Sequence, residues 1–289
     1  MIWQTWIGAG AAALAGGLLS AAFYQRRLGR ATRKLDEQRQ RHAQFLGMVS
    51  HELRTPLSSV LAFAEFLEDG LGGPLTAEQR VFVSRIQGAT LQLQRLVDDL
   101  LDYNRITQGR FMLAIRPMEY RELVASIVDQ VRPAFDLKGQ TLTVVLPDHA
   151  VTLQADPERL GQVLLNLLSN ASRYTPDGGR VEVEVRREGE NLHTWVRDNG
   201  PGIPSAALER IFQPFYQISS EATPRQAGLG LGLAIALGLT RAHGGHLSVE
   251  STVGAGTAFR LQLPIEIKGC THALTQPAVT QPLAQPSHA

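Results

Sequence analysis

A histidine followed directly by a glutamate stands in the stretch FLGMVSHELRTPLSSV, residues 45–60. A neutral imidazole is a competent nucleophile near pH 7, because its ordinary pKa of about 6.5 leaves one nitrogen lone pair free. His51 is therefore a candidate nucleophile, and Glu52 is a candidate acid–base group that could hydrogen-bond the other ring nitrogen. A surface histidine beside a surface glutamate is the plainer interpretation, so the assignment depends on the rest of the chain.

Amide side chains with the spacing of metal ligands occur in LLNLLSNASRYTPDGG, residues 164–179. Asn166 and Asn170 are one helical turn apart, so both amide oxygens can point at one Mg²⁺. Arg173 follows and could reach a phosphate group. These residues predict a site for a phosphate-bearing ligand and its metal; asparagines that only cap or pair with backbone groups are the alternative.

Two glycine-rich stretches could hold the same ligand. VRDNGPGIP, residues 196–204, places Asp198 at the end of an expected strand, before Gly200 and Gly202. GLGLGLAIA, residues 228–236, begins an expected helix with alternate glycines, which let backbone N–H groups approach phosphates closely. Each pattern alone also fits an ordinary tight turn.

The candidate nucleophile lies on the first of two apolar stripes that predict a helical hairpin. Apolar residues recur at intervals of three or four at Leu46, Val49, Leu53, Leu57, Val60, Ala64 and Leu67, and again at Phe82, Ile86, Ala89, Leu93, Leu96, Leu100 and Tyr103. Residues 69–76, DGLGGPLT, predict the turn between them. One hairpin cannot bury both sides of its stripe, so we predict that two copies form a dimeric antiparallel four-helix bundle. His51, Glu52 and Thr55 lie off the stripe and are expected to face water.

Helices and strands are mixed after Gly109. We predict helices over residues 118–136, ending near Pro133, over 157–175 with Asp156 as the N-cap, and over 228–245. Strands are expected over residues 141–147, 180–200 as a hairpin, 246–252 and 257–265. This order predicts an α/β sandwich in which helices cover one face of a mixed sheet. Residues 268–289 contain no charge after Lys268 and are expected to form a disordered tail.

The first residues predict a membrane anchor. Ile2 to Tyr24 contains no charged residue, and at about 1.5 Å per residue it would span roughly 35 Å, enough to cross a bilayer. Basic residues follow it and none precedes it, so residues 1–25 are predicted to be a single-pass transmembrane helix with the N-terminus outside and the catalytic part in the cytoplasm. A cleaved signal peptide is the alternative, but it requires a basic leading region. A linker helix is expected over residues 26–41.

The net charge and the cysteine content limit the binding partners and covalent links that can be expected. The net charge of +1 gives no reason to expect direct binding to nucleic acid. The single cysteine, Cys270, excludes an intrachain disulfide.

Five segments in order resemble the sequence boxes of two-component sensor histidine kinases: residues 45–60 the phosphoacceptor box, 164–179 the N box, 196–204 and 228–236 the glycine boxes, and 211–217, IFQPFYQ, the phenylalanine box. The resemblance implies a dimerisation and histidine phosphotransfer domain over residues 42–109 and an ATP-binding catalytic domain over 113–267. It implies that ATP, with Mg²⁺ on Asn166 and Asn170, phosphorylates His51, and that a response regulator then receives the phosphoryl group on an aspartate. The ATP-binding residues it implies are Asn166, Asn170, Arg173, Tyr174, Asp198, Gly200, Gly202, Ile203, Phe212, Phe215, Gly228, Leu229, Gly230, Leu231, Gly232 and Leu233.

The resemblance also assigns finer roles. Asp198 is expected to accept a hydrogen bond from the adenine amino group, and residues 216–227 resemble the lid that closes over ATP. Thr55 occupies the position that in many relatives positions water for dephosphorylating the regulator, so we expect that second activity as well. Gln217 departs from the family, because relatives often carry an arginine there; Arg225 could replace it.

Other functions of the same fold remain as alternatives. An ATP-hydrolysing protein of the gyrase and chaperone type shares the fold but carries a glutamate where Asn166 stands, and an asparagine cannot take a proton from water. A non-catalytic dimeric scaffold is disfavoured by the intact boxes. The stretch between Tyr24 and His51 is too short for the usual relay module, so we expect the signal to enter at the membrane, through the anchor or a membrane sensor partner.

Overall fold

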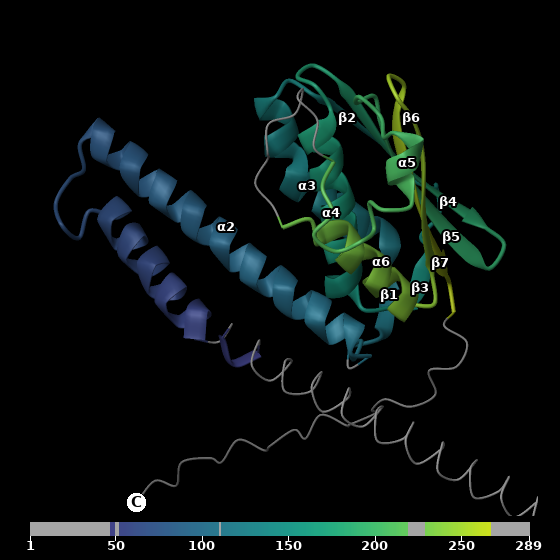
Figure 1. Cartoon of the computed structure of the whole chain (residues 1–289), viewed down its shortest axis with the longest axis horizontal. Helices are drawn as coiled ribbons and strands as arrows, with labels where there is room; N and C mark the ends of the chain where they lie inside the picture. The colour runs from purple at the N-terminus through teal and green to yellow at the C-terminus, as the bar shows by residue number, and fades with distance from the viewer. Residues whose placement is uncertain (1–46, 50–51, 110, 219–228, 267–289) are drawn as a thin grey trace, which may run out of the picture.

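The computed structural model describes residues 47–49, 52–109, 111–218 and 229–266 (Figure 1). A helical hairpin comes first, with a helix over residues 52–68 followed by a turn and the long helix α2 (Ala77–Thr107). Thr76 caps α2 through a capping box, since its side chain accepts from the Gln79 N–H and the Gln79 side chain accepts from the Thr76 N–H. The predicted hairpin and its turn are therefore confirmed.

Polar contacts tie the two hairpin helices together. Arg54 bonds Asp98 at 2.5 Å, and Gln87 donates to Glu68 at 2.9 Å. The heptad-spaced residues of α2 that become buried are Val83, Thr90 and Val97. Large apolar residues of the predicted stripes stay exposed in the single chain, namely Leu53, Val60, Leu67, Phe82, Ile86 and Leu93.

A five-stranded mixed sheet forms the centre of the second region, in the order β2-β4-β5-β7-β6. Its strands are β2 (Thr141–Val145), β4 (Arg180–Glu188), β5 (Asn191–Asp198), β6 (His246–Thr252) and β7 (Gly256–Pro264). The β2–β4 pair is parallel and the other pairs are antiparallel, so the predicted mixed sheet is confirmed. The remaining elements are β1 (Arg116–Glu119), β3 (Thr152–Ala155), α3 (Tyr120–Leu137), α4 (Pro157–Tyr174), α5 (Ser205–Leu208) and α6 (Gly232–Ala242).

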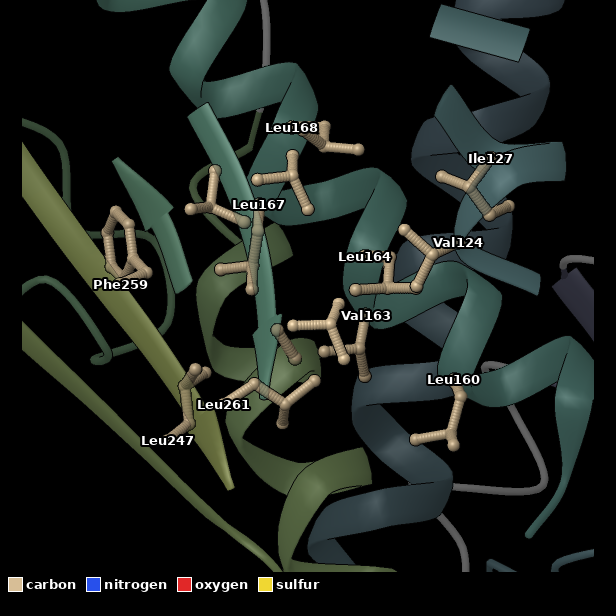
Figure 2. Packing of buried hydrophobic residues seen from close by; sticks show 14 of the residues in the cluster. Val124, Ile127, Leu160, Val163, Leu164, Leu167, Leu168, Leu247, Phe259 and Leu261 are labelled. Carbon is tan, nitrogen blue, oxygen red and sulfur yellow. The ribbon is translucent and has the colours of Figure 1, made fainter. Parts of the chain in front are cut away.

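The core lies between one face of this sheet and the helices α3, α4 and α6. Alternate residues of β4 point into it, Val181, Val183 and Val185, and each is at most 2% exposed. Figure 2 shows the leucines of α4 between Val124 and Ile127 of α3 and the sheet residues Leu247, Phe259 and Leu261. Packing against α3 and the sheet thereby fixes the position of α4, which carries both predicted metal-binding asparagines.

Two features differ from the sequence-based expectation. The helix α3 does not end near Pro133 but continues through it to Leu137. Pro133 lies on the exposed side, while the fully buried Phe135 anchors the last turn, so packing compensates for the lost N–H. The short antiparallel pair of β1 and β3 was also missed, because strands of four residues carry too little alternation to be recognised.

The C-terminal third of α2 packs against the body formed by the sheet and its helices. Leu100, Tyr103 and Ile106 contact its core, and a Cβ atom placed on Gly238 of α6 would lie 2.4 Å from Ile106 Cγ2. Only a glycine at that position permits so close an approach of the two helices.

Within the described ranges, no helix is both long and apolar enough to cross a membrane. The predicted anchor, residues 1–25, the linker, residues 26–41, and the tail, residues 268–289, lie outside the described residues.

Candidate active site

The two asparagines lie on α4, whose start follows the sequence signals. Asp156 caps the helix by accepting from the Arg159 N–H, and Pro157 is its first residue, as predicted. Asn166 donates from Nδ2 to the Gly232 carbonyl oxygen at 3.0 Å. Since a carbonyl only accepts, this contact identifies the amide nitrogen and leaves Oδ1 to act as a ligand. Asn170, half-buried, follows one turn later.

Mg²⁺ fits this donor set. The described part of the chain holds no group of three or more His, Cys, Asp or Glu side chains arranged for a metal. Mg²⁺ is commonly bound through few protein oxygens and completes its shell with waters and substrate phosphates. Two neutral amide oxygens suit that role, because a phosphate-bearing ligand would bring the negative charge.

The start of α6 supplies backbone donors beside Asn166. Gly232 is the first residue of the helix, and no side chain caps its N-terminus. The first N–H groups of a helix lack intrahelical partners and favour anions. Gly230 adopts φ +70, and a Cβ atom there would lie 2.8 Å from the Tyr216 carbonyl oxygen, so this turn requires glycine.

Asp198 is the last residue of β5 and begins the loop that carries Gly200 and Gly202. Burial raises the pKa of its carboxyl group, while hydrogen bonds from the backbone N–H groups of Gly200 and Thr257 oppose that rise. The bond from the Gly200 N–H to Oδ1 measures 2.9 Å. A carboxylate held in this way presents an acceptor to an amino group, as expected for adenine recognition.

Residues of the β6–β7 hairpin hold the Asp198 loop in place, and the sequence analysis missed them. Ser251 Oγ accepts from the Ile203 N–H and donates to the Gly256 carbonyl oxygen, both at 2.8 Å. Thr257 pairs with Asp198 across the β5–β7 ladder, and its hydroxyl lies 3.0 Å from Ser251 Oγ. Only the strand register brings these residues together, so the sequence held no local signal for them.

The phenylalanine box connects the site to the hairpin. Phe212 packs edge-on against Phe259, with ring centroids 6.4 Å apart. Phe215 has φ 62, unusual for a non-glycine residue, and its N–H donates to the Gly230 carbonyl oxygen at 3.1 Å. Its ring makes an edge contact with Tyr103 of α2 at 6.3 Å.

The other predicted site residues occupy different places. Arg173 and the exposed Tyr174 end α4, Ile203 and Leu233 are partly buried, Leu231 is buried and Leu229 is at the surface. Glu52 and Thr55 are exposed on the first hairpin helix. His51 and Gly228 lie outside the described residues, as does the expected lid beyond Ile218. Two contacts connect these segments: Asn166 of α4 bonds Gly232 at the start of α6, and a Cβ atom on Gly200 in the loop after β5 would lie 2.9 Å from the carbonyl oxygen of Tyr174 at the end of α4.

Comparison with known proteins identifies both regions. Residues 41–109 match the family model described as the His Kinase A (phospho-acceptor) domain, and residues 155–267 match the one described as Histidine kinase-, DNA gyrase B-, and HSP90-like ATPase. The chain is 37% identical over 224 residues to the circadian input-output histidine kinase CikA of Synechococcus elongatus, covering 76% of this chain and 30% of that protein. It is 34% identical over 235 residues to the sensor histidine kinase WalK of Bacillus subtilis, covering 80% of this chain and 37% of that protein.

A solved structure agrees with these matches. The crystal structure of full-length ShkA in complex with AMPPNP superposes with a TM-score of 0.64 at 33% identity, over 76% of this chain and 45% of that chain. The chain therefore spans less than half the length of each of these three relatives. Because the phosphoacceptor and ATPase models match in succession along one chain, the protein belongs to the sensor histidine kinases.

Proposed function

We propose that the protein transfers the terminal phosphoryl group of ATP to His51 and then to an aspartate of a response regulator. The observation that carries this proposal is the contact of Asn166 with Gly232, which sets an amide beside the start of α6. Hydrolytic proteins of this fold are expected to carry a glutamate at that position to activate water. An amide cannot take that proton, so the site suits an acceptor other than water.

The residues divide the work of the first transfer. Asp198 accepts from the adenine amino group, and the N–H groups at the α6 start bind phosphate oxygens. Mg²⁺, when bound to Asn166 and Asn170, would neutralise phosphate charge. The imidazole nitrogen of His51 forms the new bond to the γ-phosphorus while the bond to the β–γ bridging oxygen breaks and ADP leaves. Glu52 takes the proton from the other ring nitrogen.

Incubation of the protein with γ-labelled ATP tests this assignment. The wild type should acquire an acid-labile label, and His51→Gln should acquire none. His149→Gln is the matched control, because His149 is exposed in the ATP-binding region and has no proposed role. Label that persists in His51→Gln, or ATP turnover without any phosphohistidine, would favour the hydrolytic alternative.

The response regulator is proposed to be dephosphorylated as well, with Thr55 positioning the attacking water. Thr55 is exposed on the hairpin, where a separate protein could reach it. Thr55→Ala should leave autophosphorylation intact and slow the loss of phosphate from the regulator. Equal rates of loss with and without the hydroxyl would remove this activity from the proposal.

A dimer is proposed because the hairpin leaves apolar residues exposed in the single chain. Leu53, Val60 and Ile86 are each more than 40% exposed. Burial of such residues stabilises a bundle by about 1.5–3 kcal/mol for each side chain, so two hairpins are expected to pair. Ile86→Glu should shift the protein toward monomer in sedimentation, whereas Ser84→Glu, at an exposed polar position of the same helix, should not.

A membrane anchor over residues 1–25 and a sensor partner in the bilayer remain proposals from the sequence. Deletion of those residues should release the protein from the membrane fraction. Replacement by an unrelated transmembrane helix should abolish the response to the signal if the anchor or a membrane partner detects it, and unchanged signalling would contradict that input.

A further inference from the structure

A carboxylate of the hairpin is buried against the ATP-binding body. Asp102 Oδ2, on α2, accepts from Arg159 Nη1 at 3.0 Å and from Gln162 Nε2 at 2.9 Å, both on the first turns of α4. The Asp102 side chain is 9% exposed and the Arg159 side chain 23%. None of these residues belongs to the proposed nucleotide site.

The same stretch of α2 makes two further contacts with the body. Tyr103 meets the ring of Phe215, and Ile106 meets Gly238 of α6 without room for a Cβ atom. Asp102, Tyr103 and Ile106 therefore dock three parts of the body, namely α4, the phenylalanine box and α6. The apolar contacts are close but few, and Asp102 supplies the one charged contact between α2 and the body among the described ion pairs.

The docked body and the first helix contact different sides of α2. Ile106, which meets α6, lies eight positions after Asp98, which bonds Arg54 of the first helix, and eight residues turn the helix by about 80°. Figure 1 agrees, with α2 running between the helix over residues 52–68 and the body. Phosphoryl transfer requires the reacting atoms to approach to about 3–3.5 Å, so a body fixed on this side must leave it to reach the acceptor helix.

Because its ion pair is buried, the contact between α2 and α4 is expected to be either closed or fully open. Removal of one partner leaves an uncompensated charge, which is strongly unfavourable while the contact stays closed. Arg159 also donates to Gln162 at 3.1 Å and lies over the ring of Phe111, so its guanidinium group is held in position when docked. With Asp102 lost, Arg159 regains solvation only if the body moves away.

We propose that the contact of Asp102 with Arg159 and Gln162 is a latch that holds the ATP-binding body in a resting position on α2. Asp102 is thus a positioning residue, and opening of the latch precedes phosphoryl transfer. This inference rests on the proposed kinase function and adds to it the residues that restrain delivery of the phosphate.

The kinetic test uses the full chain with Asp102→Asn, Arg159→Gln and the double variant. Each single variant should raise the rate of autophosphorylation at saturating ATP about fivefold, or about 1 kcal/mol, with KM for ATP unchanged. The double variant should show no further rise, because both changes open one contact. Glu78→Gln is the matched control, since Glu78 is an exposed carboxylate at the opposite end of α2. An unchanged or lower rate, a higher KM, or additive effects would overturn the latch.

A distance measurement separates the latch from the kinase activity. Spin labels at Arg85→Cys on α2 and Glu209→Cys on the body, with Cys270→Ser and an excess of unlabelled protein, report docking within one chain; both positions are exposed. Asp102→Asn should shift the distances to longer values, and an unchanged distribution would refute the latch. If the wild type forms no phosphohistidine, the proposed function fails while this measurement still decides whether Asp102 holds the body.

Discussion

Gly202 offers the sharpest test of how the nucleotide site is built. It has φ +72, and a Cβ atom there would lie 2.1 Å from the Thr252 carbonyl oxygen and 2.9 Å from Val253 Cα. These are backbone atoms of the last residue of β6 and of the turn that follows it, so no side chain can rotate away. In Gly202→Ala the loop must therefore shift by about 1 Å or more to restore ordinary contact, and a shift of that size carries functional cost.

The magnitude follows from two separate effects. A left-handed backbone costs an alanine about 1–2 kcal/mol, and forcing extra volume into a packed contact costs about 1–3 kcal/mol. We expect Gly202→Ala to lose about 2–5 kcal/mol of unfolding free energy in total. Because Asp198 belongs to the same loop, ATP affinity should fall about 10–100-fold.

Gly189→Ala is the control for the backbone effect. Gly189 has φ +62 at the tip of the β4–β5 hairpin, and a Cβ atom there would meet nothing within 4 Å. The variant Gly189→Ala should lose only about 1–2 kcal/mol of unfolding free energy and keep its ATP affinity. Urea unfolding and titration with a fluorescent ATP analogue measure both quantities. If Gly202→Ala binds the analogue as tightly as Gly189→Ala does, the close packing of the loop does not control the site.

Three further predictions concern stability, each measured by urea unfolding. His243 is 1% exposed, accepts at Nε2 from the Asp156 N–H at 3.1 Å and bonds Leu239 O through Nδ1 at 2.8 Å, and burial lowers its pKa. Its contribution to the unfolding free energy should be complete above pH 6.5 and decline below it, because the unfolded chain binds the proton more tightly. The variant His243→Leu should lose that decline. Burial and two neighbouring aspartates raise the pKa of Asp99 from 3.8 to about 6. The variant Asp99→Asn should therefore stabilise the protein above pH 6 by about 1 kcal/mol after allowance for partial exposure, and this gain should fade toward pH 4. A constant gain at all pH values would contradict this. Leu167→Ala should cost about 2–5 kcal/mol, because Leu167 is fully buried in the core.

Local sequence patterns were enough to predict most of the fold. The apolar spacing of three and four residues predicted the hairpin, and Asp156 followed by Pro157 marked the start of α4. Alternation along β4 gave a strand with one buried face. Each of these signals acts between residues close in sequence, so the sequence displays it directly.

What the sequence could not show depends on contacts between distant residues. Thr257 reaches Asp198 only through the register of β7 on β5, and Asp102 meets Arg159 across 57 positions. Asp102 is a polar residue near the end of an apolar stripe, and such a residue is expected to be solvent-exposed unless its partner is known. Pro133 misled for the same reason, because the packing of Phe135 outweighs the local preference of proline.

The helix α4 explains how docking and nucleotide binding can be independent. Its first turns contact Asp102, whereas its middle, at Asn166, contacts Gly232 within the body. Gln140 holds the other end, accepting from Ser172 Oγ and donating to the Ser172 and Thr175 carbonyl oxygens. Since buried leucines and Gln140 fix α4 to the body without any help from the hairpin, loss of the Asp102 contact should leave the position of Asn166 unchanged. Opening of the Asp102 contact should then leave ATP affinity unchanged and alter only where the bound phosphate is presented.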